Sequence, residues 1–123
     1  CKAEIENNLN GPAAALPYLN QIRARAGAPE YGKHNRFPAP STKEAMNDAI
    51  LKERGYELVF EFQRRADLIR FGKYEEVVNA HLKKLGIAQP TNVTSSLRYF
   101  PYPLNDDHLN PNLAAENPSR LPK

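Results

Sequence analysis

The first 26 residues carry apolar positions at helical spacing. Ile5 and Leu9 lie four residues apart in the polar segment 2–9, which is typical of one side of an amphipathic helix. A second helix is expected over residues 13–26, with an inward side made of Leu16, Leu19, Ile22 and Ala26. Together the two segments predict an antiparallel helical hairpin over residues 1–26, a unit that is found in helical repeats.

A glycine and two prolines set the limits of these helices. Gly11 suits the end of the first helix, and Pro12 suits the first position of the second. Pro17 has no amide hydrogen to donate inside a helix. The second helix is therefore expected either to begin near Pro17 or to kink there.

A long loop and further helices are expected next. Residues 27–41 have no apolar period and predict a loop, whereas residues 42–85 predict helices. The first of these helices should reach residue 71, with a bend at Gly55. The second covers residues 74–85 and has an apolar side made of Val77, Val78, His81, Leu82 and Leu85.

The start of the first of these later helices has the pattern of a capping box. Ser41 is expected to be the N-cap, and the Glu44 side chain is expected to reach back to it.

The remaining residues, 86–123, predict an irregular tail. The chain has 11 prolines, and they crowd into residues 27–40 and 89–123, where regular structure is not expected. The pattern as a whole predicts a mainly helical fold with long irregular loops and a proline-rich C-terminal tail.

Composition excludes several classes of function. Seventeen basic and 14 acidic residues are mixed along the chain and do not form the basic stripe of a nucleic-acid-binding protein. Cys1 is the single cysteine, so no internal disulfide can form. The sequence has no glycine-rich phosphate loop and no nucleophile motif. Asp106, Asp107 and His108 could hold a cation, but their spacing matches no defined metal loop, and no cofactor is expected.

Acidic and basic residues are interleaved with apolar ones in the stretch ILKERGYELVFEFQRRADLIRFGK, residues 50–73. One predicted apolar side of its helix is made of Leu51, Leu58, Phe62 and Ile69. Beside it lies a predicted stripe in which charges pair along the helix, made of Arg54, Glu57, Glu61 and Arg65. Almost no side of this helix is wholly polar, so its charges are expected to be partly buried and paired.

The same stretch allows a catalytic alternative. Glu57 and Glu61 could be the two carboxylates of a glycoside hydrolase. Those carboxylates must flank the scissile bond, whereas side chains four residues apart on one helix lie side by side. A structural network is therefore favoured, and no enzymatic activity is expected.

Part of the loop 27–41 has side chains that suit ligand binding. Aromatic planes beside amide and guanidinium donors can stack on sugars or peptides and hydrogen-bond to them, and the candidates are Tyr31, Asn35, Arg36 and Phe37. In the alternative interpretation, Tyr31 and Phe37 fold back onto the helices as parts of an ordinary surface loop.

Three ordered motifs resemble one family, the SusD/RagB nutrient-binding lipoproteins. ERGYELVFEFQRRADLIRFGK resembles a family signature, and the charged residues that fall on it are Glu53, Arg54, Glu57, Glu61, Arg64, Asp67 and Arg70. LNQIRARAG upstream and PYPLNDDHLNPNLAAENPS downstream are similar to flanking family motifs. Phe62 stands where the family signature has a glycine.

The resemblance implies a fold of tetratricopeptide-like helix pairs and a role in nutrient import. It implies a lipid-anchored protein of the outer membrane at the cell surface, in bacteria of the Bacteroidetes type, whose anchor lies outside this segment. The implied partner is a SusC/RagA-like TonB-dependent transporter, whose barrel the protein caps while it binds an oligosaccharide or peptide. Family members are several times longer, so residues 1–123 are expected to be the C-terminal segment of such a domain.

Two other functions remain as alternatives, a helical-repeat adaptor that binds proteins and a carbohydrate-active hydrolase. The nutrient, its binding groove and the ratio of protein to transporter are left open. Within the structural interpretation, we expect five signature side chains to pair internally or to bind the backbone of the tail, namely Arg54, Glu57, Glu61, Arg64 and Asp67.

Overall fold

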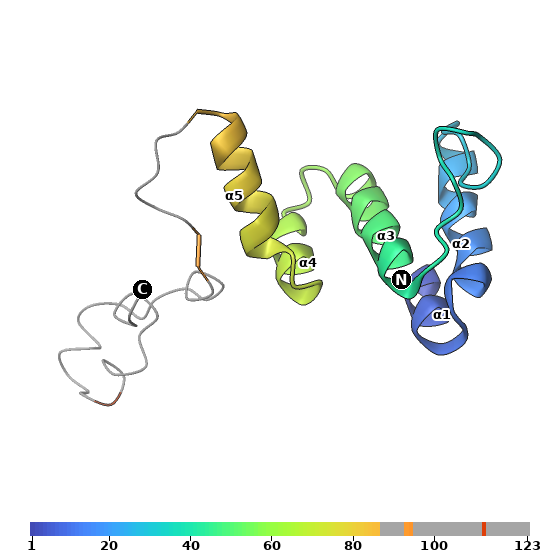
Figure 1. Ribbon diagram of the computed structural model, residues 1–123, viewed down its shortest axis with the longest axis horizontal. Helices are drawn as coiled ribbons and strands as arrows, with labels where there is room; N and C mark the ends of the chain where they lie inside the picture. Colours follow the sequence, from blue (N-terminus) through green and yellow to red (C-terminus); the bar gives the residue numbers. More distant parts are fainter. Residues whose placement is uncertain (87–92, 95–111, 113–123) are drawn as a thin grey trace. The chain divides into compact units, whose positions relative to one another are not determined.

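The computed structural model describes residues 1–86, 93–94 and 112 (Figure 1). The chain forms two compact units, Cys1–Asp67 and Leu68–Lys123. In the described part of the chain the regular structure is helical, apart from one isolated bridge between His34 and Phe37. The predicted mainly helical fold class is confirmed.

Helices α1 (Lys2–Asn10) and α2 (Pro12–Arg25) pack against each other in the first unit. Gly11 separates them with a φ of 90°, a left-handed conformation that glycine adopts readily, and Pro12 follows at the start of α2. Helix α2 continues through Pro17, so the prediction that it begins near Pro17 is wrong. The helix tolerates Pro17 because a single intrahelical hydrogen bond is lost.

The side that α1 buries differs from the predicted one. Ile5 and Leu9 are 56% and 74% exposed, whereas Ala3 and Asn7 are buried. Ala3 is small and permits close helix packing, and Asn7 Nδ2 donates to the carbonyl oxygen of Lys43 at 2.8 Å. Apolar spacing alone indicated the wrong side because the buried Asn7 side chain is held through its nitrogen, which donates to Lys43 and Asn47, whereas its Oδ1 has no partner among the described residues.

The inward side of α2 was also predicted only in part. Leu19 is buried as expected, but Ile22 is half-buried, and Ala26 follows the end of the helix and is exposed. The residues that α2 buries are Ala15, Leu19, Asn20 and Arg23.

Helix α3 (Lys43–Glu57) packs against both α1 and α2, and its core side includes Met46 and Ile50. Its N-cap is Thr42, whose Oγ1 accepts a hydrogen bond from the Ala45 amide at 3.1 Å. The predicted capping box of Ser41 and Glu44 is therefore wrong. Thr42 has the extended backbone of a cap, which places the helix start one residue later than predicted.

The predicted helix through residue 71 is interrupted after Glu57. Residues 58–63 form a turn, and helix α4 (Arg64–Arg70) follows. Phe60 and Phe62 have φ values of 67° and 57°, which end the right-handed helical path. Glycine adopts this conformation most readily, so the phenylalanine at position 62 is strained where the resembled signature has a glycine. Phe62 is 96% exposed, so its predicted place on the apolar side is wrong.

Gly55 lies within α3, so the interruption follows it rather than occurring at it. A Cβ atom at Gly55 would lie 2.9 Å from Nη1 of Arg64. That same Nη1 donates to the carbonyl oxygen of Leu51 at 2.7 Å. Gly55 therefore provides the space in which the Arg64 guanidinium reaches the backbone of α3.

In the second unit, helix α5 (Tyr74–Lys84) agrees with the predicted helix within one residue. Val77, Val78 and Leu82 are half-buried. His81 and Leu85 are exposed, so their predicted places on the apolar side are wrong; Leu85 lies just after the end of the helix.

One residue of the predicted tail is bound through its backbone to α5. Asn79 Nδ2 donates to the Val93 carbonyl oxygen at 3.0 Å, and the Val93 amide donates to Asn79 Oδ1 at 2.7 Å. The rest of the tail, apart from residues 86, 94 and 112, lies outside the described residues.

Candidate functional site

Arg23, near the end of α2, is the centre of a buried polar network. It is 5% exposed, and its Nη1 donates to Oε1 of Glu53 on α3 in a buried ion pair. Its Nε donates to the carbonyl oxygen of Pro29 at 2.5 Å. Its Cζ atom lies 4.6 Å from the ring centroids of both Tyr31 and Phe37, at the distance of a cation–π contact. One guanidinium therefore connects two helices and the loop.

Asn20, one turn before Arg23, fixes the same loop through its backbone. Asn20 Nδ2 donates to the Tyr31 carbonyl oxygen at 2.9 Å, and the Tyr31 amide donates to Asn20 Oδ1 at 2.8 Å. Burial raises the pKa of the Tyr31 phenol above its ordinary value of 10.0. The Glu53 carboxylate adds to this rise in the pKa, and the Arg23 guanidinium opposes it.

The four loop residues proposed to bind a ligand differ in their exposure. Tyr31 is 9% exposed, and its ring meets that of Phe37 edge to face with the centroids 6.0 Å apart. Asn35 and Arg36 are exposed in the turn between His34 and Phe37. Tyr31 is therefore part of the packing beneath the loop, and Phe37 alone of the four lines one of the pockets described below.

The charged residues of the family signature connect separate elements. Arg54 Nε, in α3, donates to Asp67 Oδ2, in α4, at 2.8 Å. Glu57 forms an ion pair with Arg25 of α2. The predicted pairing along one helix is wrong, because the turn at residues 58–63 interrupts that helix.

Two further signature residues lie elsewhere. Glu61 is exposed in the turn, contrary to the expectation that it would be paired within the network. Arg70, in the second unit, has its Cζ atom 4.6 Å from the centroid of the Phe71 ring. Glu57 and Glu61 share neither a helix nor a described pocket, and this arrangement disfavours the hydrolase interpretation.

A pocket of about 420 Å³ lies between the loop, the end of α2 and the outer part of α3. This volume is within the range of roughly 300–1,000 Å³ that is usual for small-molecule sites. The lining includes two aromatic rings, Phe37 and Tyr56, and two charged side chains, Lys52 and Glu57. Arg23 and Glu53 lie at the same pocket with their charges paired to each other. We call this the loop pocket.

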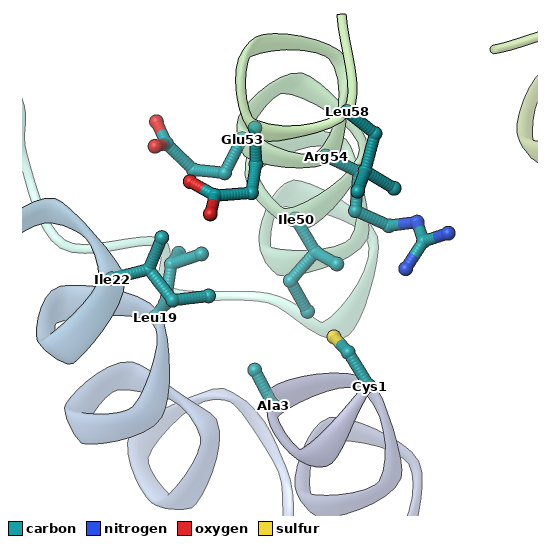
Figure 2. Close-up of a pocket in the computed structure, with 9 residues that line it drawn as sticks. Cys1, Ala3, Leu19, Ile22, Ile50, Glu53, Arg54 and Leu58 are labelled. Atoms are coloured by element: carbon teal, nitrogen blue, oxygen red, sulfur yellow. The ribbon is translucent and has the colours of Figure 1, made fainter. Parts of the chain in front are cut away.

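A second pocket, of about 160 Å³, lies between α1, α2 and α3 (Figure 2). Figure 2 shows Leu19, Ile22 and Ile50 pointing toward one another, with Ala3 and the Cys1 sulfur beside them. Leu58, at the end of α3, is the last apolar residue of the lining, and the charged residues Glu53, Arg54 and Glu57 also line the pocket. We call this the apolar pocket. It is well below the usual volume of a small-molecule site and is close to the size of one side chain.

Sequence reasoning missed three residues that line the loop pocket, namely Arg23, Lys52 and Tyr56. Tyr56 is 63% exposed, and no pattern in the sequence distinguishes it from the other aromatic residues of the same stretch. Arg23 occurs in the motif LNQIRARAG, but nothing in that motif indicates that its partner, Glu53, is 30 residues away.

Metal sites and membrane-spanning helices can be assessed only in the described part of the chain. Among residues 1–86, 93–94 and 112, no cluster of three His, Cys, Asp or Glu side chains could hold a metal ion. The proposed trio of Asp106, Asp107 and His108 lies outside these residues. Within the same described residues, no helix has the length and apolar character needed to cross a bilayer.

Comparison with known proteins identifies the family. The model of the SusD family matches residues 1–119. The chain is 37% identical over 109 residues to SusD-like protein P25 of Formosa agariphila, an overlap that covers 89% of this chain and 20% of that protein. No solved structure matches the chain. The chain spans about a fifth of the length of this curated relative. Because the family model covers nearly the whole chain, the protein belongs to the SusD family.

Proposed function

We propose that the protein is a non-catalytic binding component of a nutrient importer in the outer membrane. The observation that carries this proposal is the match of the SusD family model over residues 1–119. The proposal includes that the chain is part of a longer, lipid-anchored polypeptide at the cell surface, which caps a SusC/RagA-like TonB-dependent transporter. The ligand is an oligosaccharide or a peptide, and the protein does no chemistry on it.

The loop pocket is the proposed contact with that ligand. Phe37 and Tyr56 offer ring faces for stacking, and the Lys52 ammonium is a hydrogen-bond donor beside them. Arg25 neutralises part of the charge of Glu57, whose carboxylate oxygens remain acceptors for hydroxyl or amide groups. Such a mixture of stacking surface, donor and acceptor suits a polar ligand with apolar faces.

Calorimetric titration of the whole protein with sets of oligosaccharides and peptides tests the proposal. Tyr56→Ala should weaken binding about tenfold, because one exposed aromatic stacking surface is lost. Leu9→Ala is the matched control, since it also shortens an exposed apolar side chain but lies outside the loop pocket. Equal affinities of Tyr56→Ala and the unmodified protein would place ligand binding away from this pocket.

Two further measurements test the class of function. Purification from the outer membrane should recover a large TonB-dependent barrel together with the protein. Recovery of soluble proteins and no barrel, with no ligand in the titrations, would favour a protein-binding adaptor. Turnover of an oligosaccharide that is lost in Glu57→Gln would contradict a non-catalytic role.

A further inference from the structure

The turn after α3 presents apolar side chains that the described residues do not cover. Val59, Phe60 and Phe62 are 60%, 90% and 96% exposed, and we call them the aromatic turn. Tyr56, one turn earlier in α3, is also exposed. Soluble proteins seldom leave several large apolar side chains next to one another in water, and such patches commonly mark interaction sites.

The backbone of the aromatic turn is also unfavourable. Phe60 and Phe62 both have φ in the left-handed region, where residues other than glycine are strained. Strained residues persist where their surroundings fix them. The Glu61 amide donates to the Leu58 carbonyl oxygen at 3.1 Å, which closes the turn but contacts neither phenylalanine ring. Within the described residues, neither ring is packed in a way that would offset this strain, since both are almost fully exposed.

The aromatic turn directly follows, in the chain, a residue that lines the apolar pocket of Figure 2. Leu58 lines that pocket and directly precedes Val59 in the chain. The pocket, at about 160 Å³, has room for one apolar side chain. The first unit thus offers both a projecting aromatic pair and a nearby hole of side-chain size, which together match the irregular surface of another polypeptide segment.

Charge beside the rings suits a polypeptide partner. Glu61 lies between Phe60 and Phe62 and is exposed, and the basic residues Arg64 and Arg65 follow closely in the chain. A place with charges of both signs lacks the basic cluster that anionic membranes attract. The backbone and side chains of a polypeptide segment can pair with such charges and cover the rings at the same time.

We infer that the aromatic turn and the apolar pocket are the docking surface for a segment of the same, longer polypeptide outside residues 1–123. The curated relative is long enough to supply it, since the matched part is only 20% of that protein. The docked segment contributes an apolar side chain to the pocket and covers Phe60 and Phe62. This inference rests on the part of the proposed function that places the chain in a longer polypeptide, and it does not depend on nutrient binding.

Photo-crosslinking in the whole polypeptide tests the inference. The crosslinker p-benzoylphenylalanine is introduced at position 62, where it resembles the native ring, and peptides joined by irradiation are identified by mass spectrometry. The control places it at position 44, in the exposed first turn of α3. We expect position 62 to join to residues outside 1–123 in high yield and position 44 to give little product. Products confined to residues 1–123, or joined to a different protein, would overturn the inference.

Hydrogen exchange of the unmodified polypeptide gives a second test that requires no substitution. The amides of Leu58 and Glu61 are already hydrogen-bonded to backbone carbonyl oxygens, so the test uses the other amides of residues 58–63. If the turn is covered, these should exchange at least about 100-fold more slowly than in the unfolded chain. Exchange within about tenfold of the unfolded rate would show an open turn and contradict docking. Calorimetry on the same sample separates the two proposals. Ligand binding together with an open turn would contradict docking but leave the proposed function intact. A covered turn without ligand binding would leave the docking intact.

Discussion

Two ion pairs join α2 to α3, and they differ in their surroundings rather than in their chemistry. Arg23 and Glu53 have side chains that are 5% and 9% exposed, whereas Arg25 and Glu57 are 67% and 42% exposed. Arg23 has further partners in Pro29 and two aromatic rings. The outer pair lies next to the exposed turn at the end of α3.

This difference separates a pair that must stay intact for the fold from a pair that stays accessible to solvent. A buried charge must keep its partner, since removal of one member leaves the other without solvent or counter-charge. An exposed pair gains little, because water and salt already screen both charges. Glu57 can therefore accept a ligand contact at low cost, whereas Glu53 cannot leave Arg23 without disrupting the loop.

The largest expected effect comes from breaking the buried pair. Arg23→Ala should lower the free energy of unfolding by about 3–5 kcal/mol, because the Glu53 carboxylate would remain buried and unpaired. Urea unfolding followed by circular dichroism measures this change. Arg23→Lys keeps the positive charge and should lower the free energy of unfolding less than Arg23→Ala does. A loss no larger than that of the exposed pair would refute the distinction between the two regions.

The pair of Arg54 with Asp67 is intermediate in burial, with side chains 23% and 7% exposed. Arg54→Ala should lower the free energy of unfolding by about 1.5–3 kcal/mol, the usual range for a hydrogen bond to a charged group. The same urea titration measures it. If Arg54→Ala costs more than Arg23→Ala, the degree of burial is not what orders these pairs.

Asn20 extends the comparison of buried and exposed partners to an uncharged side chain. Asn20→Ala should lower the free energy of unfolding by about 1–3 kcal/mol, because both backbone groups of Tyr31 lose their buried partner. Hydrogen exchange at the Tyr31 amide should accelerate in the same variant. Asn79→Ala is a natural control, since Asn79 makes the same two contacts with Val93 at a part-buried site and should cost less.

The smallest effect is expected at the exposed pair. Arg25→Ala should change the free energy of unfolding by at most about 1 kcal/mol, and added salt should reduce even this difference. Thermal unfolding at low and high ionic strength measures both quantities. A large loss that salt does not reduce would show that the outer pair is covered in the whole polypeptide.

The sequence predicted the positions of most helices, because glycine, proline and apolar spacing act within a few residues. Gly11 and Pro12 mark the boundary of α1 and α2, and α5 begins at Tyr74 as predicted. The choice of Ser41 over Thr42 as N-cap was wrong, since both residue types cap helices and only backbone geometry distinguishes them.

The residues of the candidate site were predicted less well from the sequence than the helices were. Tyr31 and Phe37 were both proposed as ligand contacts; Phe37 lines the loop pocket, whereas Tyr31 is buried beneath the loop. Tyr56 and Lys52 come to the same pocket from α3, and no local pattern connects them with a loop some 15 residues away.

By itself, the sequence determined a helical protein of the SusD family, because local periodicity and ordered motifs are properties of the linear chain. The tertiary structure alone decided which charges are buried and paired. Arg23 and Glu53 are 30 residues apart, and their contact depends on how two helices and a loop pack around them. The same packing places Asn7 inside and Leu9 outside, since burial follows available partners as well as hydrophobicity.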